Sequence, residues 1–199
     1  MGEGSTEGGG AARVFLDACV LFPPLVRSIL LSLAERGVFE PFWSQRVLDE
    51  WRLSVVRKYG LSVEAEIMAA QDAMMTRFET AMGEADPDFE ALIELPDPAD
   101  AHVLAAAHAL DAKVLLTFNL RDFPRRALAR TAITVRHPDE FLWDLLSGSP
   151  SPVAAATAEA LAGAEVPPDR TRQVLKRARL PRFGKALVAY QGNPADGGR

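Results

Sequence analysis

Four short acidic segments, spread over about a hundred residues, carry the side chains best suited to chemistry in this sequence. They occupy positions 15–18, 48–51, 97–100 and 117–123. In each segment a carboxylate borders an apolar run that we expect to be buried. Two carboxylates about 4 Å apart repel each other by roughly 4 kcal/mol at an effective dielectric near 20, and a hard divalent cation removes this cost. The pattern therefore predicts a Mg²⁺ or Mn²⁺ site.

Some of these acids also have simpler explanations. Asp97 precedes Pro98, a combination that favours capping of a helix N-terminus over metal ligation. Asp100 could be the partner of that cap or could point inward at the head of an apolar stripe. Glu50 competes with Asp49, and either could be a solvated acid on a helix surface. For Asp100 and for Glu50, the two explanations stay open on these patterns alone.

Cysteine and histidine offer no competing site. Cys19 is the single cysteine, so an intramolecular disulfide is excluded, and no activating base lies near it in the sequence. We interpret it as a small, half-buried residue. His102 and His108 are six positions apart, which places them on different faces of a helix and argues against a zinc site.

Composition predicts one soluble globular domain with an appendix. The chain has 199 residues, of which 48% are hydrophobic and 25% are charged. Residues 1–12 are Gly-rich and are expected to form a flexible leader and not a secretory signal. No apolar run is long enough to span a membrane. Together with the single cysteine, this favours a cytoplasmic protein.

Charge is distributed unevenly along the chain. The net charge is −5, but residues 39–100 contain 14 acids and 5 bases, whereas residues 166–199 contain 8 bases and 2 acids. An acidic metal centre flanked by a basic surface that holds a polyanion would produce this asymmetry. The alternative is that the basic residues near the C-terminus form a solvated helix face. Those residues are Arg170, Arg172, Lys176, Arg177, Arg179 and Arg182.

Hydrophobic periodicity predicts an α/β fold with a central, mostly parallel sheet flanked by helices. We expect strands over 14–16, 38–43, 113–117 and 132–136. We expect helices over 25–34, 45–55, 63–82, 98–110, 127–128 and 138–146. The expected domain covers 13–147, followed by a Ser- and Pro-rich linker over 148–152, a small helical extension over 153–190 and a disordered tail over 191–199.

The expected sheet places several polar residues at one edge. Ligands of open parallel sheets bind outside the carboxyl ends of the strands. Asp17 directly follows the first strand, while Asn119 and Asp122 follow the strand that ends at Thr117. These groups are therefore expected to face one crevice. Glu50, two turns into the helix after the second expected strand, could also turn toward it.

The acidic segments, taken with their neighbours, resemble the motifs of a PIN domain, and more narrowly those of VapC-type toxin ribonucleases. The resemblance covers residues 13–146 and keeps all four motifs in order. The motifs are 14–21 (VFLDACVL), 43–50 (WSQRVLDE), 100–107 (DAHVLAAA) and 117–124 (TFNLRDFP). The helical tail is also similar, more loosely, to an extension found in one subgroup of these toxins.

The resemblance implies roles for individual residues. Asp17, Glu50 and Asp100 match the three principal acids, which would bind Mg²⁺ or Mn²⁺. Asn119 stands where some relatives have an acid, and Asp122 supplies a carboxylate three residues later. Which of these two completes the site stays open. Thr117 would assist through its hydroxyl, so the implied catalytic set is Asp17, Glu50, Asp100, Thr117, Asn119 and Asp122.

The implied activity is metal-dependent hydrolysis of RNA by an activated water. Arg121, Arg125 and Arg126 could hold flanking phosphates, although a solvated face explains them equally well. The resemblance further implies a cognate antitoxin that blocks the acidic site, and a homodimer. The alternatives within the family are RNA processing, action on DNA and a non-catalytic nucleic-acid-binding module.

Two alternative functions outside this activity have less support in the sequence. A phosphatase or dehalogenase with Asp17 as covalent nucleophile would need a second acid or a threonine shortly afterwards, and positions 18–21 contain neither. A module without catalysis would have no physical reason to keep mutually repelling carboxylates.

Overall fold

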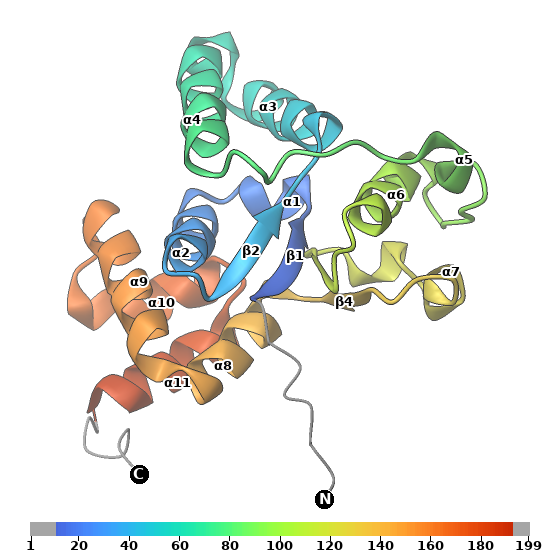
Figure 1. Ribbon diagram of the computed structural model, residues 1–199. Coiled ribbons are helices and arrows are strands. Elements are labelled where there is room, and N and C mark those ends of the chain that lie inside the picture. Colours follow the sequence, from blue (N-terminus) through green and yellow to red (C-terminus); the bar gives the residue numbers. More distant parts are fainter. Residues whose placement is uncertain (1–10, 193–199) are drawn as a thin grey trace, which may run out of the picture.

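The computed structural model of the protein describes residues 11–192, and its centre is a four-stranded parallel sheet (Figure 1). The strand order is β2-β1-β3-β4. The strands are β1 (Ala12–Leu16), β2 (Phe39–Phe42), β3 (Val114–Leu116) and β4 (Thr134–Arg136). The predicted α/β class and parallel sheet are confirmed, and the strand ends differ from the expected ones by at most two residues.

The two central strands are buried on both faces, which explains their unbroken apolar sequences. Val14, Phe15 and Leu16 of β1 are fully buried, and they pair in register with Val114, Leu115 and Leu116 of β3. From β1 the chain passes to β2 on one side, and later to β3 on the other side. The carboxyl ends of β1 and β3 therefore flank the point where the strand order reverses, the usual position of a ligand crevice in such sheets.

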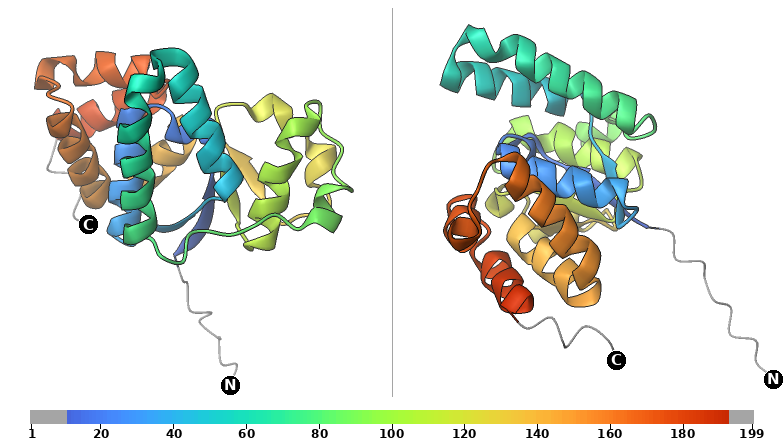
Figure 2. Two further views of the ribbon diagram at one scale, coloured as in Figure 1. Left: turned by 90° about the horizontal axis from the view of Figure 1, so that it is seen from above. Right: turned by 90° about the vertical axis from the view of Figure 1, so that its left-hand side faces the viewer.

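Helices surround the sheet, as the views in Figures 1 and 2 show. The α3–α4 hairpin lies at the carboxyl ends of β1 and β2, and α5 to α7 lie on the opposite flank from α2 and α9. The helices of the first part of the chain are α1 (Ala18–Leu21), α2 (Pro24–Glu35), α3 (Gln45–Tyr59), α4 (Glu64–Arg77), α5 (Pro87–Glu90), α6 (Ala101–Ala109) and α7 (Arg125–Leu128). The remaining helices are α8 (Pro138–Gly148), α9 (Pro150–Gly163), α10 (Thr171–Arg177) and α11 (Pro181–Gly192).

The expected helix starts are found to within three residues, whereas two expected helix ends are wrong: α3 continues to Tyr59, and α4 stops short of residue 82. The Ser44 hydroxyl accepts a hydrogen bond from the Val47 amide at 3.3 Å and caps α3. The helix expected over 63–82 ends at Arg77, because the following chain pairs with the end of β2. Trp43 donates its amide to the Ala81 carbonyl, and its own carbonyl accepts from the Gly83 amide. Helical spacing extends past Arg77 in the sequence, but these backbone hydrogen bonds replace the last turn.

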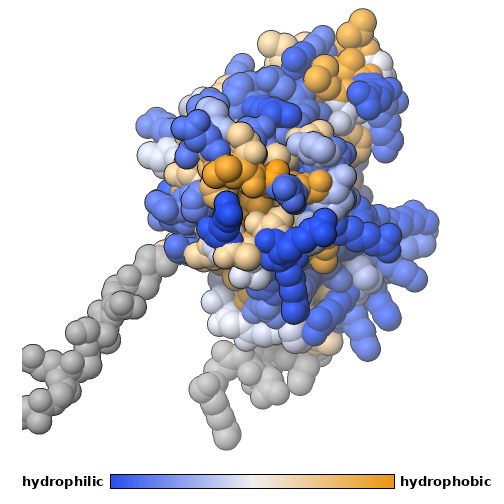
Figure 3. Space-filling view, turned by 90° about the vertical axis from the view of Figure 1, so that its right-hand side faces the viewer, coloured by the Kyte–Doolittle hydropathy of each residue, from blue (hydrophilic) through white to orange (hydrophobic). Residues whose placement is uncertain are grey.

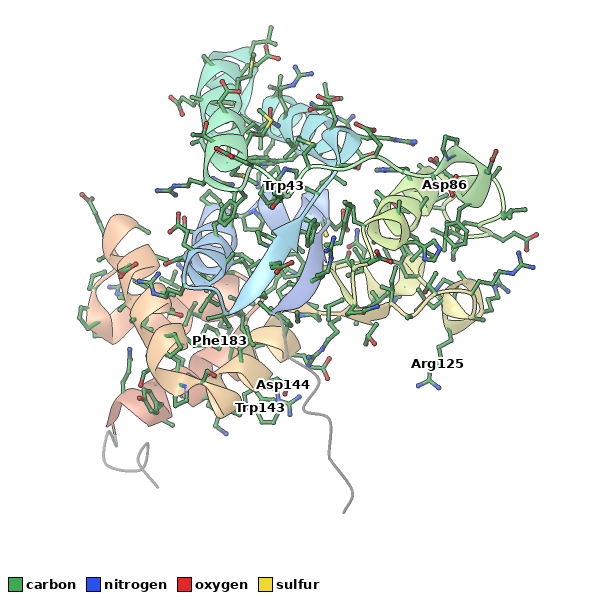
Figure 4. The ribbon with its side chains drawn as sticks, viewed as in Figure 1. Trp43, Asp86, Arg125, Trp143, Asp144 and Phe183 are labelled. Carbon is green, nitrogen blue, oxygen red and sulfur yellow. The ribbon has the colours of Figure 1, made fainter. Side chains whose placement is uncertain are left out.

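The C-terminal helices share the core of the sheet domain. Val153, Leu175, Phe183 and Leu187 are fully buried and belong to the same hydrophobic cluster as β1. Figure 4 shows Phe183 on the side of α11 that faces the rest of the protein. Asp139 of α8 also caps α11, because its carboxylate accepts hydrogen bonds from the first amides of that helix.

At three of the expected boundaries the structure has regular elements where linker, leader or tail residues were expected. Residues 148–152, expected as a linker, form a helix junction: α8 ends at Gly148 and α9 begins at Pro150. Ala12 of the expected leader begins β1, and residues 1–10 lie outside the described residues. Gln191 and Gly192 of the expected disordered tail belong to α11, and residues 193–199 are not described. The division into a domain and an extension stays a prediction.

None of the helices within 11–192 combines the length and the apolar character needed to cross a bilayer.

The contact between α10 and α11 has no room for a larger residue at Gly184. A Cβ atom there would lie 2.9 Å from Cβ of Leu175, which is fully buried. We expect Gly184→Ala to lower the free energy of unfolding by about 1–3 kcal/mol, because either helix must shift. Urea unfolding measures the change. Gly163→Ala is the matched control, since a Cβ at that helix end meets nothing within 4 Å, and equal stability losses in both variants would contradict the tight packing.

Candidate functional site

Asp17 sits at the reversal point of the sheet, directly after β1. Its amide donates to the Leu116 carbonyl at 3.1 Å, which ties it to the end of β3. Its side chain is 8% exposed. Oδ2 accepts hydrogen bonds from Oγ1 of Thr117 at 2.6 Å and from Sγ of Cys19 at 3.1 Å. Both donors act on Oδ2, so Oδ1 remains available for a ligand.

Thr117 holds Asp17 in a defined orientation. Its Oγ1 is fully buried and accepts a hydrogen bond from the Asn119 amide at 3.0 Å. The hydroxyl proton is therefore free to go to the Asp17 carboxylate. Moving either side chain would leave a buried polar group without its hydrogen-bond partner, which costs free energy. The pair therefore keeps a fixed geometry.

Cys19 supports the same cluster as a protonated thiol. Its Sγ accepts from the Phe118 amide at 3.2 Å. Burial, and then the negative charge of Asp17, raise the pKa of the Cys19 thiol far above its ordinary value. Since the thiolate is the reactive form, this agrees with the expectation that Cys19 is not a nucleophile.

Glu50 reaches the site from α3 and is half-buried. Its Oε1 lies 2.8 Å from Nε2 of His102, which is 2% exposed on α6. The ring N–H is not aligned for a hydrogen bond despite this distance, so the two groups are in contact without one. Arg46 lies one turn before Glu50 at 3.7 Å. His102 thus packs against Glu50 from a neighbouring helix.

Asp100 shows that the acids converge. It ends the short 3-10 helix Pro98–Asp100 that leads into α6, and Asp97 caps that turn through a hydrogen bond from the Ala99 amide at 2.9 Å, as predicted. Burial raises the pKa of Asp100 to about 6. The next contributions come from the negative charges of Asp17, Asp122, Asp97 and Glu50, in that order. All four acidic segments therefore act on one carboxyl group.

An open cleft of about 860 Å³ collects these side chains. It is lined by Asp17, Glu50, Asp100 and Asn119, and also by Asp97 and Arg57. Asp122 lines a second, adjoining cavity of about 410 Å³ together with Arg121 and His137. Phe118, Asn119 and Arg179 border both. The structure thus brings Asn119 into the cleft with the three principal acids and places Asp122 next to it.

The donor set fits a hard divalent cation that keeps part of its water shell. The converging groups are carboxylate oxygens. Burial, and then the negative charges of the neighbouring acids, raise the pKa of Asp100, and a cation would stabilise its charged form. Within residues 11–192, no three His, Cys, Asp or Glu side chains are grouped closely enough to enclose a metal. Mg²⁺ usually binds through one or two carboxylates plus waters and substrate phosphates. Asp17, Glu50 and Asp100 are the carboxylates of this cleft that could contribute such ligands.

The expected phosphate-binding arginines separate into two groups. Arg121 lines the cavity beside Asp122. Arg126 instead lines a separate cavity of about 270 Å³, with Phe89 and Leu92, between α5 and α7. Figure 3 shows an apolar area surrounded by hydrophilic residues on this flank. Arg125 extends from α7 away from the carboxyl ends of the strands (Figure 4), so neither Arg125 nor Arg126 lines the acidic cleft.

Sequence reasoning missed the contacts of four side chains that line these cavities or contact the acids: Phe118, His137, Arg179 and His102. Phe118, His137 and Arg179 stack together: the Arg179 guanidinium lies 4.4 Å from the Phe118 ring centroid, and the His137 ring lies 5.1 Å from it. Burial, and then the charge of Arg179, lower the pKa of His137. In the sequence, His102 was considered only together with His108, as a pair that does not form a zinc site. The basic composition of the tail drew attention to Arg179, but no local pattern shows that it folds back 61 residues to Phe118.

Comparisons with known proteins show the family to which the chain belongs. Residues 13–121 match the profile of the family described as PIN domain. A Mycobacterium tuberculosis protein named "Putative ribonuclease VapC50" is 51% identical over 47 residues. This alignment covers 24% of this chain and 28% of the relative, so the similarity spans under a third of the relative's length. No solved structure matches the chain.

The raised pKa of Asp100 makes metal-free stability depend on pH. The folded protein binds the Asp100 proton more tightly than the unfolded chain does, so this contribution is present at low pH and is lost as pH rises from about 4 through about 6. A shift of this size corresponds to about 3 kcal/mol, and partial exposure reduces it to on the order of 1–2 kcal/mol. We expect Asp100→Asn to raise the free energy of unfolding by that amount at pH 8 in EDTA and to change it little at pH 4.

Urea unfolding at both pH values measures this effect. Asp72→Asn serves as the control, because Asp72 is an exposed carboxylate on α4. A stabilisation of the same size at pH 4 and pH 8 would contradict the assigned repulsion.

Proposed function

Because the chain belongs to the PIN-domain family, we propose that it is a metal-dependent endoribonuclease that hydrolyses phosphodiester bonds of RNA. The observation that carries the proposal is the convergence of Asp17, Glu50 and Asp100 on one open cleft at the reversal point of the sheet. A cleft that holds repelling carboxylates suits a divalent cation and a phosphate together. The name of the Mycobacterium relative supports RNA as the substrate.

Each side chain has a distinct part in the proposed reaction. Bound Mg²⁺ or Mn²⁺ would supply Lewis acidity, lower the pKa of a water and offset charge on the scissile phosphate. Asp17 offers Oδ1, while Thr117 and Cys19 keep Oδ2 fixed. Glu50 borders the same cleft and is in close contact with His102. The Asn119 amide borders the same cleft and can bind a substrate oxygen or a water without adding charge.

Asp122 has a supporting part in this proposal. It lines the adjoining cavity and contributes to the raised pKa of Asp100, so it acts on the cleft electrostatically. Arg121 lies in the same cavity and can contact a flanking phosphate. We propose that Asn119 completes the cleft, and that Asp122 acts on it only through its negative charge.

We further propose that the protein is the toxin of a toxin–antitoxin pair and acts in the cytoplasm. An acidic cleft of this kind can be blocked by a basic side chain from a partner protein, which is how an antitoxin would inhibit it. The name of the VapC-type relative supports this role. A homodimeric state is proposed only from the resemblance of the four motifs to those of VapC-type toxins.

Asp17→Asn tests the metal site. The change keeps the hydrogen-bond acceptor but removes the charge, so we expect Mg²⁺-dependent cleavage to fall by at least about 100-fold, which corresponds to about 3 kcal/mol of lost transition-state stabilisation. The assay uses a random pool of 40-nucleotide single-stranded RNA, and gel analysis measures the rate. Wild-type cleavage that persists in EDTA, or full activity of Asp17→Asn, would contradict the proposal. Asp72→Asn controls for the loss of a remote carboxylate.

Thr117 variants test whether Asp17 must be held by a hydroxyl. We expect Thr117→Val to lower the cleavage rate by roughly 10-fold, because the carboxylate loses its shortest hydrogen bond, whereas Thr117→Ser should keep most of the rate. Thermal unfolding in EDTA shows whether each variant is folded. Equal activity of the Val and Ser variants would show that the hydroxyl has no positioning role.

A further inference from the structure

Among the described residues after α8, only Arg179 lines the acidic cleft. It follows α10, where the chain turns toward α11. The cleft has two basic lining residues, Arg57 from α3 and Arg179, and only Arg179 also lines the cavity that contains Asp122. Its position therefore spans the two parts of the candidate site.

The backbone at Arg179 is firmly anchored. The Arg179 amide donates to the Lys176 carbonyl at 3.1 Å, and the Leu180 amide donates to the Leu175 carbonyl at 2.9 Å. These are the two hydrogen bonds of a Schellman helix end. Leu175 and Leu180 are fully buried on either side of the turn. The base of the Arg179 side chain is thus held by core packing.

Arg179 occupies a conformation that favours glycine, with φ of 64°. Asp111 and Glu165 have similar angles at other helix ends. The conformation alone therefore indicates no function, but it provides a useful test, because glycine at this position would relieve backbone strain and remove only the side chain.

The guanidinium is fixed in place but keeps most of its donors. It stacks on the Phe118 ring at 4.4 Å, and Nη2 donates to the Phe118 carbonyl at 3.2 Å. A guanidinium has five N–H donors. In the part of the chain that the structure describes, no carboxylate oxygen forms a salt bridge with Arg179, although it shares the cleft with Asp17, Glu50 and Asp100. The side chain is exposed, and its remaining donors are available to an anion.

We propose that Arg179 binds a phosphodiester group of the RNA at the rim of the cleft, so that the C-terminal helices supply part of the active site. This inference rests on the proposed ribonuclease function. A planar guanidinium held on an aromatic ring matches two oxygens of one phosphate. Its positive charge also offsets the acids that the substrate must approach. The neighbouring Arg182 has a different role, since it stacks on Trp143 at 3.8 Å on the side of α8.

The test compares Arg179→Gln, Arg179→Gly and Arg179→Lys with Arg177→Gln. Arg177 is an exposed arginine two residues earlier, at the end of α10, and it lines neither cavity. Cleavage of the random 40-nucleotide RNA pool in Mg²⁺ is measured over a range of salt concentrations. We expect KM to rise about 10-fold in the Gln and Gly variants with a smaller change in kcat, and the Lys variant to recover part of the loss. The slope of log KM against log salt should fall by about 0.7, the value for one lost contact to a single strand.

Stability measurements separate binding from folding. We expect Arg179→Gly to unfold at the same or a higher temperature than the wild type while losing RNA affinity, and Arg177→Gln to keep KM within about twofold. An active wild type whose KM and salt slope are unchanged by Arg179→Gln would overturn this inference alone. A wild type that cleaves none of the RNA pool would overturn the proposed function and this inference with it.

Discussion

The pairing of β1 with β3 is the constraint on which the rest of this site depends. It brings residues a hundred positions apart into contact, so that Thr117 can donate its hydroxyl proton to Asp17 over 2.6 Å. The two strands are buried on both faces, and a slip in register would separate these groups. Because the strand order reverses between β1 and β3, the chain leaves their carboxyl ends in opposite directions, and a cleft lies at this point. The same packing that holds the core together therefore leaves an open cleft beside an oriented carboxylate.

Electrostatics at this cleft opposes stability. Asp100 lies in a partly buried position near four other acids, and its pKa is raised to about 6 in consequence. Burial of the surrounding apolar residues must offset this repulsion in the absence of a cation. A site of this kind is adapted to a charged ligand more than to the stability of the empty protein. Within residues 11–192 the acids line an open cleft, and no three of them are grouped closely enough to enclose a metal.

The C-terminal helices belong to the same packing unit as the sheet domain. Asp139 of α8 caps α11, an ion pair between Arg36 and Glu159 joins α2 to α9, and Phe183 and Leu187 enter the common core. Once α10 and α11 are docked in this way, the turn between them lies beside Phe118. The basic composition of this segment is thus not explained by a solvated face alone, because one of its arginines stacks in the cleft while another stacks on Trp143.

The sequence by itself determined the parallel α/β class, the strands, the caps at Ser44 and Asp97, and the acids at the ends of elements, because each depends on local periodicity or on a neighbouring backbone donor. Only the tertiary structure decided the rest. It ended α4 at Arg77 by pairing the following chain with Trp43, and it turned the expected linker at 148–152 into a helix junction. It also placed Asn119 in the cleft and Asp122 beside it, and brought His102 to Glu50 and Arg179 to Phe118. These contacts join residues that are distant in the chain, and their geometry depends on how helices dock on the sheet, which no local pattern encodes.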